Sequence, residues 1–157
     1  MSNLVTIFGG SGFLGRYIAS RMAKQGWRVR VAVRHPNEAL FVRTYGGVGQ
    51  VEPVLANIRD EESTKKAIKG AKVVINCVGI LLEGRRQKFQ TVQVQGAERI
   101  ARLSSIEGVE RLVHISAIGA NTNSESIAAR TKGEGEKSVL KAFPTAVILR
   151  PSIVFGV

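Results

Sequence analysis

The sequence predicts a doubly wound α/β fold, in which one parallel sheet carries helices on both faces and forms a three-layer α/β/α domain. Strand-like and helix-like segments alternate along the chain without a linker or an internal repeat. The segment Val73–Ile75 is continuously apolar, as expected of a strand that is buried on both faces. Because parallel neighbours are joined by right-handed crossovers through helices, this alternation indicates a parallel sheet.

The elements follow one another in a regular order. Strands are expected at Leu4–Phe8, Arg28–Val33, about Gln50–Leu55, Lys72–Cys77, Arg111–Ser116 and Ala146–Leu149. Helical segments are expected at Arg16–Lys24, near Asn37–Tyr45, at Asp60–Lys69, around Phe89–Ser105 and roughly at Ile127–Ala142. Ligands of such sheets bind beyond the carboxyl ends of the strands, so the residues that follow each strand are the candidates for a site.

Three glycines with the spacing G-x-x-G-x-x-G lie between the first strand and the first helix. Gly9 permits a tight turn, Gly12 lets the backbone approach phosphate oxygens, and Gly15 lets the helix pack closely. Free amides at the start of the helix then face the anion. In this context the run predicts a dinucleotide site, and the alternative is a glycine-rich turn without a ligand.

Arg34 ends the second strand, where an NAD-binding unit would place an acidic residue about 20 residues beyond the glycines. A carboxylate there would hold both ribose hydroxyls and repel a 2′-phosphate, whereas a guanidinium can bind that phosphate through paired hydrogen bonds. We therefore expect NADP(H) rather than NAD(H). The alternative is that Arg34 is one more solvated charge in a basic chain.

Composition limits the remaining possibilities. The 157 residues are expected to form one dinucleotide-binding domain over residues 1–157, in a reducing cytoplasm. Cys77 is the only cysteine, so no disulfide and no metal site are expected. The longest apolar run, Val73–Leu82, is too short to span a bilayer. The net charge of +11 favours an acidic or membrane-bound partner over nucleic acid, because the basic residues are dispersed and only 6% of the residues are aromatic. The alternative is a solvated basic face without a partner.

Several motifs together resemble one known family. They are GGSGFLG at Gly9–Gly15, VRHP at Val33–Pro36, NCVG at Asn76–Gly79, HISAIGA at His114–Ala120, RTKGEGE at Arg130–Glu136 and LRPSIVFG at Leu149–Gly156. In order and spacing they resemble the atypical short-chain dehydrogenases/reductases, which are epimerase/dehydratase-like proteins with an NAD(P)-binding Rossmann fold. Within that group the chain is most similar to the nucleotide-binding accessory subunit of respiratory complex I and its bacterial relatives.

The resemblance implies a set of cofactor-binding residues. They are Gly9, Ser11, Gly12, Phe13, Leu14 and Gly15 at the pyrophosphate, Arg34 at the 2′-phosphate, Asn57 and Ile58 beside the adenine, Cys77, Val78 and Gly79 under the ribose, and Lys132 at the nicotinamide ribose. Asn57 stands where relatives place an aspartate. Cys77 needs no redox role, because a small, buried residue at the end of a strand is the better interpretation.

The catalytic positions depart from the family pattern. Active members carry Tyr-x-x-x-Lys on the fifth helix; Lys132 matches the lysine, but the residue four positions earlier is Ala128. A methyl group cannot act as a general acid, so carbonyl reduction loses its proton donor. Ser116 lies near the position of the family's active-site Ser/Thr. Lys132 and Ser116 remain the catalytic candidates, with a surface lysine and a capping serine as the alternatives.

Three functions are compatible with these residues. The first is a structural or assembly subunit that holds NADP(H) and is linked to the respiratory NADH:quinone oxidoreductase, at the periphery of the inner membrane. The second is an NADPH-dependent oxidoreductase or epimerase for a quinone, carbonyl or sugar-nucleotide substrate. The third is a sensor of the NADP(H) redox state. The family's motif at Leu149–Gly156 ordinarily leads into a substrate-binding segment, so we also expect this chain to be the N-terminal part of a longer protein.

Overall fold

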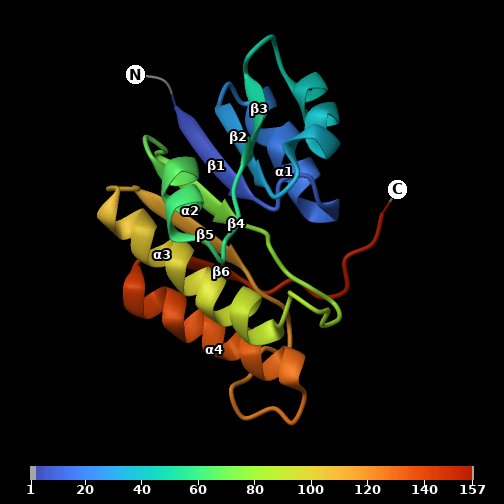
Figure 1. The fold of residues 1–157 in the computed structure, drawn as a ribbon, viewed down its shortest axis with the longest axis vertical. Helices are drawn as coiled ribbons and strands as arrows, with labels where there is room; N and C mark the ends of the chain where they lie inside the picture. The colour runs from blue at the N-terminus through green and yellow to red at the C-terminus, as the bar shows by residue number, and fades with distance from the viewer. Residues whose placement is uncertain (1–2, 157) are drawn as a thin grey trace.

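The computed structural model describes residues 3–156, which form a six-stranded parallel sheet (Figure 1). Its strands are β1 (Leu4–Phe8), β2 (Arg28–Val33), β3 (Val51–Leu55), β4 (Val73–Asn76), β5 (Arg111–Ile115) and β6 (Val147–Leu149). They lie in the order β3-β2-β1-β4-β5-β6, and Ile7 of β1 pairs with Val31 of β2 and Ile75 of β4. The predicted fold class is therefore confirmed.

Helices cover both faces of this sheet. They are α1 (Phe13–Lys24), the 3₁₀ helix η1 (Pro36–Tyr45), α2 (Glu61–Ile68), the π-helical turn η2 (Gln90–Gly96), α3 (Ala97–Ile106) and α4 (Ile127–Ala142). The prediction for α4 is confirmed residue for residue. The first helix begins three residues before the predicted Arg16, because Gly12 is extended and takes the N-cap position. The predicted helix Phe89–Ser105 is divided into the turn η2 and α3.

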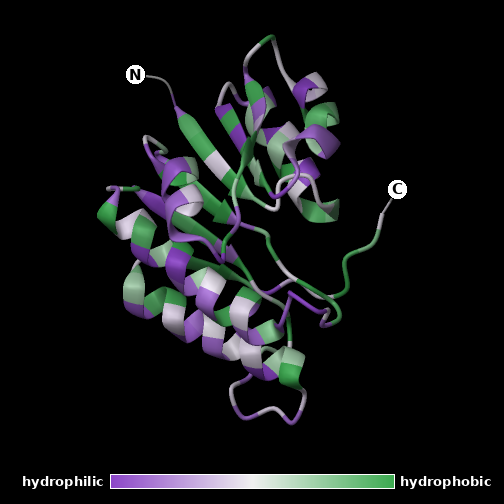
Figure 2. Cartoon of the chain, viewed as in Figure 1, coloured by the Kyte–Doolittle hydropathy of each residue, from purple (hydrophilic) through white to green (hydrophobic). Residues whose placement is uncertain are grey.

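Two apolar cores lie on the two sides of the sheet. Val5, Ile7 and Val31 pack against α1 and η1 on one side, whereas Phe8 and Val74 pack against α2, α3 and α4 on the other. Side chains alternate between the faces of a strand, so β1 and β4 contribute to both cores. This double burial explains why both strands are mostly hydrophobic along their length, with Thr6 as the polar residue inside β1 (Figure 2).

Close backbone contacts fix the position of α4. A Cβ atom built at Gly135 would lie 2.1 Å from the carbonyl oxygen of Gln93 in η2, so only glycine permits this approach. Gln93 also donates a hydrogen bond of 2.7 Å to Thr131 of α4. The neighbouring residue Lys132 is thereby held at the carboxyl edge of the sheet.

The strand order reverses between β1 and β4, since β2 follows β1 on one side and β4 adjoins it on the other. The crevice at such a switch point is the usual binding position in doubly wound sheets. In the described part of the chain, no helix is long and apolar enough to cross a membrane.

Candidate dinucleotide-binding site

A cavity of about 450 Å³ opens at the switch point, beyond the carboxyl ends of β1, β2, β3 and β4. This volume lies within the range of small-molecule and cofactor pockets. Of the predicted binding residues, those that line it are Gly9, Ser11, Gly12, Arg34, Asn57, Ile58, Cys77, Val78 and Gly79. Segments that are far apart in the sequence thus meet at one place.

The glycine run forms the floor of the cavity. Gly9 has a φ of +73°, and a Cβ there would lie 3.2 Å from the Cys77 backbone at the end of β4. A Cβ at Gly15 would lie 2.2 Å from the carbonyl oxygen of Gly9, so α1 can approach the turn only with glycine at this position. No side chain caps the first turn of α1, so its amides remain available to an anion. This cradle fits a diphosphate.

Arg16 is a pocket residue that the sequence analysis did not identify. Its guanidinium donates hydrogen bonds to the carbonyl oxygens of Gly12 and Ser11, at 3.2 and 2.9 Å, and stacks 4.9 Å from the centroid of the Phe41 ring. Its place one helical turn after Gly12 was the available signal. Arg16 therefore braces the phosphate turn and adds positive charge to the pocket.

Arg34 lies directly after β2 and is exposed at the pocket wall. When the Gln87 amide is oriented with its oxygen toward Arg34, that oxygen accepts hydrogen bonds from both guanidinium nitrogens, one of them at 3.0 Å. Gln87 belongs to the loop that follows β4. The contact places this loop beside the cation that would meet a 2′-phosphate.

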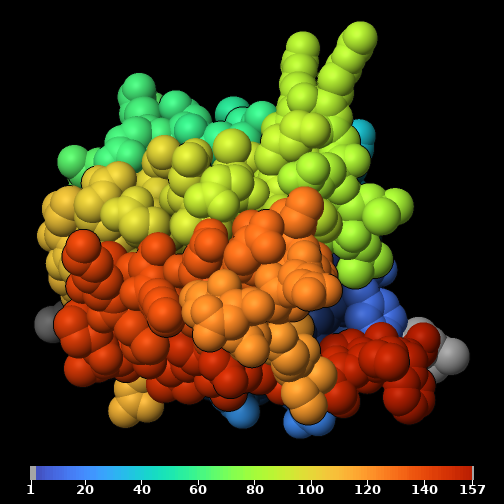
Figure 3. Space-filling view, turned by 90° about the horizontal axis from the view of Figure 1, so that it is seen from below, coloured from blue at the N-terminus to red at the C-terminus, as the bar shows by residue number. Residues whose placement is uncertain are grey.

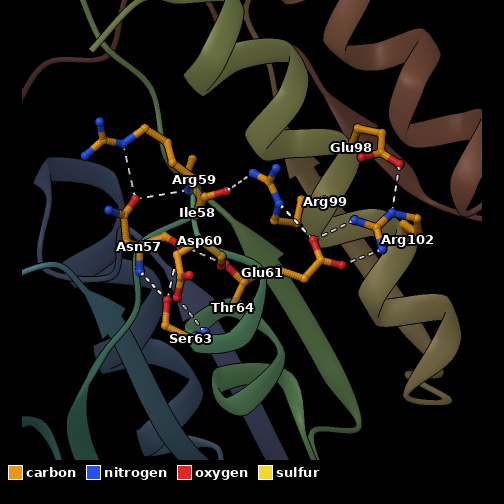
Figure 4. Close-up of polar contacts among 10 residues, drawn as sticks. All are labelled: Asn57, Ile58, Arg59, Asp60, Glu61, Ser63, Thr64, Glu98, Arg99 and Arg102. Carbon is orange, nitrogen blue, oxygen red and sulfur yellow. Dashed lines mark hydrogen bonds and ion pairs between the residues drawn. The ribbon is translucent and has the colours of Figure 1, made fainter. Parts of the chain in front are cut away.

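The loop after β3 forms the adjoining wall, next to Arg34, because β3 pairs with β2. Figure 4 shows the polar contacts of this loop. The side-chain oxygen of Asn57 accepts hydrogen bonds from the backbone and guanidinium nitrogens of Arg59, at 3.0 and 3.3 Å. The side-chain amide nitrogen of Asn57 is then the group available to a ligand. An aspartate would present an acceptor here, so Asn57 changes the polarity of the expected adenine contact.

An ion-pair network holds the same loop from behind (Figure 4). Arg99 of α3 donates to the carbonyl oxygen of Ile58 at 2.6 Å and to Glu61 of α2 at 3.1 Å. Glu61 also accepts two hydrogen bonds from Arg102, at 2.7 and 2.8 Å. The hydrogen bond from Arg102 is the main reason why the pKa of Glu61 falls to about 2. The network ties the loop to two helices.

Cys77, Val78 and Gly79 pass across the top of β4. Burial raises the pKa of the Cys77 thiol to about 12, so it stays protonated and is a poor nucleophile. Gly79 faces Lys132, since a Cβ there would lie 3.6 Å from Nζ. Burial lowers the pKa of Lys132 below its usual value. The lysine therefore reaches from α4 to the edge of the cavity without being one of the residues that line it.

Polar groups behind Lys132 form a second buried cluster. Glu136 is bound by the Arg150 guanidinium, with its Nε at 2.8 Å and its Nη2 at 2.5 Å. Burial would raise the pKa of Glu136, but Arg150, the nearby Ser116 hydroxyl and His114 outweigh it and hold the pKa below its usual range. Burial, helped by Lys132, lowers the pKa of His114 to about 4. Asn76 contacts Nδ1 of this neutral ring at 3.2 Å.

The remaining predicted residues lie outside the cavity lining. Phe13, Leu14 and Gly15 open α1 just beyond it, and Ser116 follows β5. Ser116 is only 4% exposed, and its hydroxyl lies near enough to Glu136 to help lower the pKa of that carboxyl, although it makes no well-formed hydrogen bond among residues 3–156. Within the same residues, no group of three or more His, Cys, Asp or Glu side chains could hold a metal ion.

The sequence matches known proteins over nearly its whole length. It is 38% identical to the "NADH dehydrogenase [ubiquinone] 1 alpha subcomplex subunit 9, mitochondrial" of Mus musculus, over 98% of this chain and 41% of that protein. It is 34% identical to the "NADH-ubiquinone oxidoreductase 40 kDa subunit, mitochondrial" of Neurospora crassa (96% and 40%), and 33% identical to the "Ceramide reductase" of Caulobacter vibrioides (98% and 47%). The chain thus spans less than half the length of these relatives.

Solved structures share the fold at low sequence identity. The Bordetella bronchiseptica enzyme WbmG in complex with NAD superposes with a TM-score of 0.77 and 17% identity, over 96% of this chain and 53% of that one. A mutated uronate dehydrogenase superposes with a TM-score of 0.74 and 17% identity, over 95% of this chain and 58% of that one. A family model described as "NAD(P)H-binding" matches residues 9–147. The chain therefore belongs to the NAD(P)H-binding family, with the Rossmann fold of the epimerase/dehydratase-like proteins.

Proposed function

We propose that this chain is the nucleotide-holding part of a structural or assembly subunit linked to a respiratory NADH:quinone oxidoreductase. In this proposal NADP(H) binds as a ligand that stabilises the fold and is not turned over. The partners are the dinucleotide and acidic or membrane-bound subunits of the complex. The setting is the cytoplasm, at the periphery of the inner membrane. The observation that carries the proposal is Ala128 at the position of the proton donor.

The absence of a proton donor at the position of Ala128 supports a role without turnover. Ala128 lies one helical turn before Lys132 on α4, and its backbone carbonyl is engaged by Gln93 and Thr131. A bound nicotinamide would supply hydride chemistry, but a carbonyl substrate also needs a proton. Neither tyrosine of the chain stands on α4, because Tyr17 belongs to α1 and Tyr45 to η1.

The basic pocket supports NADP(H) as the ligand. Arg16, Arg34 and Arg59 all line the cavity, against a single carboxylate, Glu38. Phosphate groups are the anions that such guanidinium clusters bind best. Arg34 follows β2 at the position where NAD-binding units carry an acidic residue, which supports a 2′-phosphate over free ribose hydroxyls as its partner.

The names of the relatives support subunits of a respiratory complex as the protein partners. Two of them carry names of mitochondrial NADH dehydrogenase subunits, at 34–38% identity. The basic net charge of +11 suits acidic partner surfaces.

The proposal is tested in two steps with purified protein. NADPH is titrated by calorimetry and should bind more tightly than NADH. At 100 times its dissociation constant it should stabilise the chain by about 2.7 kcal/mol in urea unfolding. NADPH oxidation is then followed with quinones and carbonyls, and pull-down from solubilised membranes should recover dehydrogenase subunits. NADPH turnover that survives repeated purification would contradict the proposal, as would the absence of affinity for both dinucleotides.

One observation favours an oxidoreductase as the second candidate. Lys132 keeps the family position, lies near Gly79 and has a lowered pKa, so it could orient a nicotinamide ribose. The substrate would then have to bring or recruit its own proton donor, such as a water on the unpartnered hydroxyl of Ser116. The turnover assay above distinguishes the two candidates.

A further inference from the structure

The loop after β4 carries a set of side chains that neither the fold nor the nucleotide site uses. We call residues 81–88 the Leu81–Lys88 loop. Leu81 and Leu82 are 94% and 83% exposed, and Arg85 and Arg86 are exposed as well. Within residues 3–156, neither of these two guanidinium groups forms an ion pair or a hydrogen bond. Four large side chains therefore point to solvent from one short segment.

The backbone of the loop is nevertheless held in place. The amide of Gly84 donates to the Gln87 carbonyl at 2.9 Å and closes a turn, and Glu83 accepts from the amide of Phe89 at 2.9 Å. Arg59 donates to the carbonyl of Arg86 at 2.7 Å, which fastens the loop to the pocket wall. The loop is thus an ordered projection, visible as the yellow-green segment that extends beyond the rest of the surface (Figure 3).

The Leu81–Lys88 loop carries a net positive charge. Lys88 lies 3.9 Å from Glu83, the only acidic residue of the loop, so this pair largely cancels. Arg85 and Arg86 remain as the net charge at the tip, next to the two leucines in the sequence. Apolar side chains that enter the acyl boundary, beside cations that meet lipid phosphates, are the combination that binds anionic bilayer surfaces.

We propose that the Leu81–Lys88 loop docks the protein on an anionic lipid surface, with Leu81 and Leu82 inserted and Arg85 and Arg86 on the headgroup phosphates. A convex projection suits a bilayer, which deforms around it, better than a protein partner, which would need a matching pocket. Leucine is also under-represented among the residues that dominate protein–protein binding energy. The inference rests on the peripheral-membrane part of the proposed function and deepens it by naming the surface.

The test is flotation of the purified chain with vesicles. One set contains equal parts of phosphatidylcholine and phosphatidylglycerol, and the other contains phosphatidylcholine alone. Binding is expected only to the anionic set, and it should weaken as salt is added. The pair Leu81→Ser/Leu82→Ser should lower the partition coefficient by about tenfold per leucine. The pair Arg85→Gln/Arg86→Gln should lower it by roughly thirtyfold, at about 1 kcal/mol per arginine.

Matched control variants lie shortly before the amino ends of β2 and β3, whereas the loop follows the carboxyl end of β4. Val48→Ser removes another fully exposed apolar side chain, and Arg21→Gln/Lys24→Gln removes two exposed charges from α1. Both should bind vesicles like the parent chain. NADPH affinity and thermal unfolding are measured for every variant and should not change in the loop variants, so a failure of nucleotide binding is recognised separately.

Four outcomes would overturn the inference. Equal losses of vesicle binding in the control and loop variants would indicate adsorption by total charge. A loss of binding in the arginine pair alone would show that Leu81 and Leu82 do not insert into the bilayer. Self-association that requires Leu81 and Leu82, without vesicle binding, would assign the loop to a second copy of the chain. Loop-dependent capture of solubilised dehydrogenase subunits, again without vesicle binding, would assign it to an acidic protein surface.

Discussion

At the scale of single residues, the proposed preference for NADP(H) rests on Arg34. It directly follows β2 at the pocket wall, and its guanidinium is oriented by Gln87. Arg34→Asp should reduce NADPH affinity by about a hundredfold, because paired hydrogen bonds to a phosphate are lost and a repulsive charge is added. NADH affinity should change little. Calorimetric titration of both nucleotides checks this.

Arg21→Asp is the control for that charge change, because Arg21 is exposed on α1 away from the pocket. It should leave both affinities close to those of the parent chain. Equal losses of NADPH and NADH binding in Arg34→Asp would contradict the proposal that Arg34 binds the 2′-phosphate.

Ala128 is the residue at which a single change could restore chemistry. Ala128→Tyr would place a phenol one helical turn from Lys132, whose charge lowers the pKa of such a group. We expect NADPH-dependent reduction of small carbonyls or quinones at least a hundredfold above the parent, the usual contribution of a general acid. Steady-state NADPH oxidation is the measurement.

Glu134→Tyr, two residues after Lys132 on α4, turns the same side chain to the other side of the helix and should remain inactive. Ala128→Tyr/Lys132→Met should also lose the gain, because the phenol then lacks its cation. A gain of equal size in Glu134→Tyr would show that Ala128 is not the position of the missing donor.

Single residues also mark what the sequence could not predict. The glycine run and Arg34 were recognisable because spacing and strand ends constrain their position. Arg16 and Arg59 were missed because their role depends on where a long side chain turns, which spacing does not specify. The polarity of Asn57 likewise became defined only once Arg59 was seen to occupy its oxygen.

At the scale of elements, α2 and α3 position the loop after β3, the proposed adenine side of the pocket, through Arg99 and Glu61. Arg99→Met removes the hydrogen bond to Ile58, so the loop after β3 should loosen. Affinity for 2′,5′-ADP should fall by about tenfold, the cost of one hydrogen bond to a charged group. Affinity for reduced nicotinamide mononucleotide should not change, because that half of the ligand lies across the pocket. Arg111→Met, an exposed change at the start of β5, should affect neither ligand.

The ends of the helices and strands show where local sequence is sufficient to predict an element. β1, β2 and α4 were predicted to the residue, because glycines, prolines or clear periodicity bound them. The π-helical turn η2 was not predicted. Its geometry accompanies the close approach of Gly135 to Gln93, a contact between segments about 40 residues apart. Tertiary contacts of this kind leave no periodic signal.

At the scale of the whole molecule, stability should depend on the buried cluster around His114. The pKa of His114 is about 4 in the folded chain, against 6.5 for the free side chain, because burial disfavours the charged ring. The unfolded chain therefore binds the proton first as the pH falls below 6.5. Stability should drop progressively between pH 6.5 and about 4, by up to about 3 kcal/mol.

Urea unfolding at a series of pH values measures this slope. His114→Gln removes the titrating ring and should flatten the curve in that range, whereas His35→Gln, an exposed change after β2, should keep the slope of the parent chain. A curve that His114→Gln leaves unchanged would assign the slope to other groups.

The strand order has a consequence for synthesis. β1 is made first but occupies the interior of the sheet, between β2 and β4. One edge can pair as soon as β2 emerges from the ribosome, whereas the other stays bare until residue 76 has been added. During that interval the nascent chain exposes an apolar hydrogen-bonding edge, which makes it a client for chaperones and a target for mispairing.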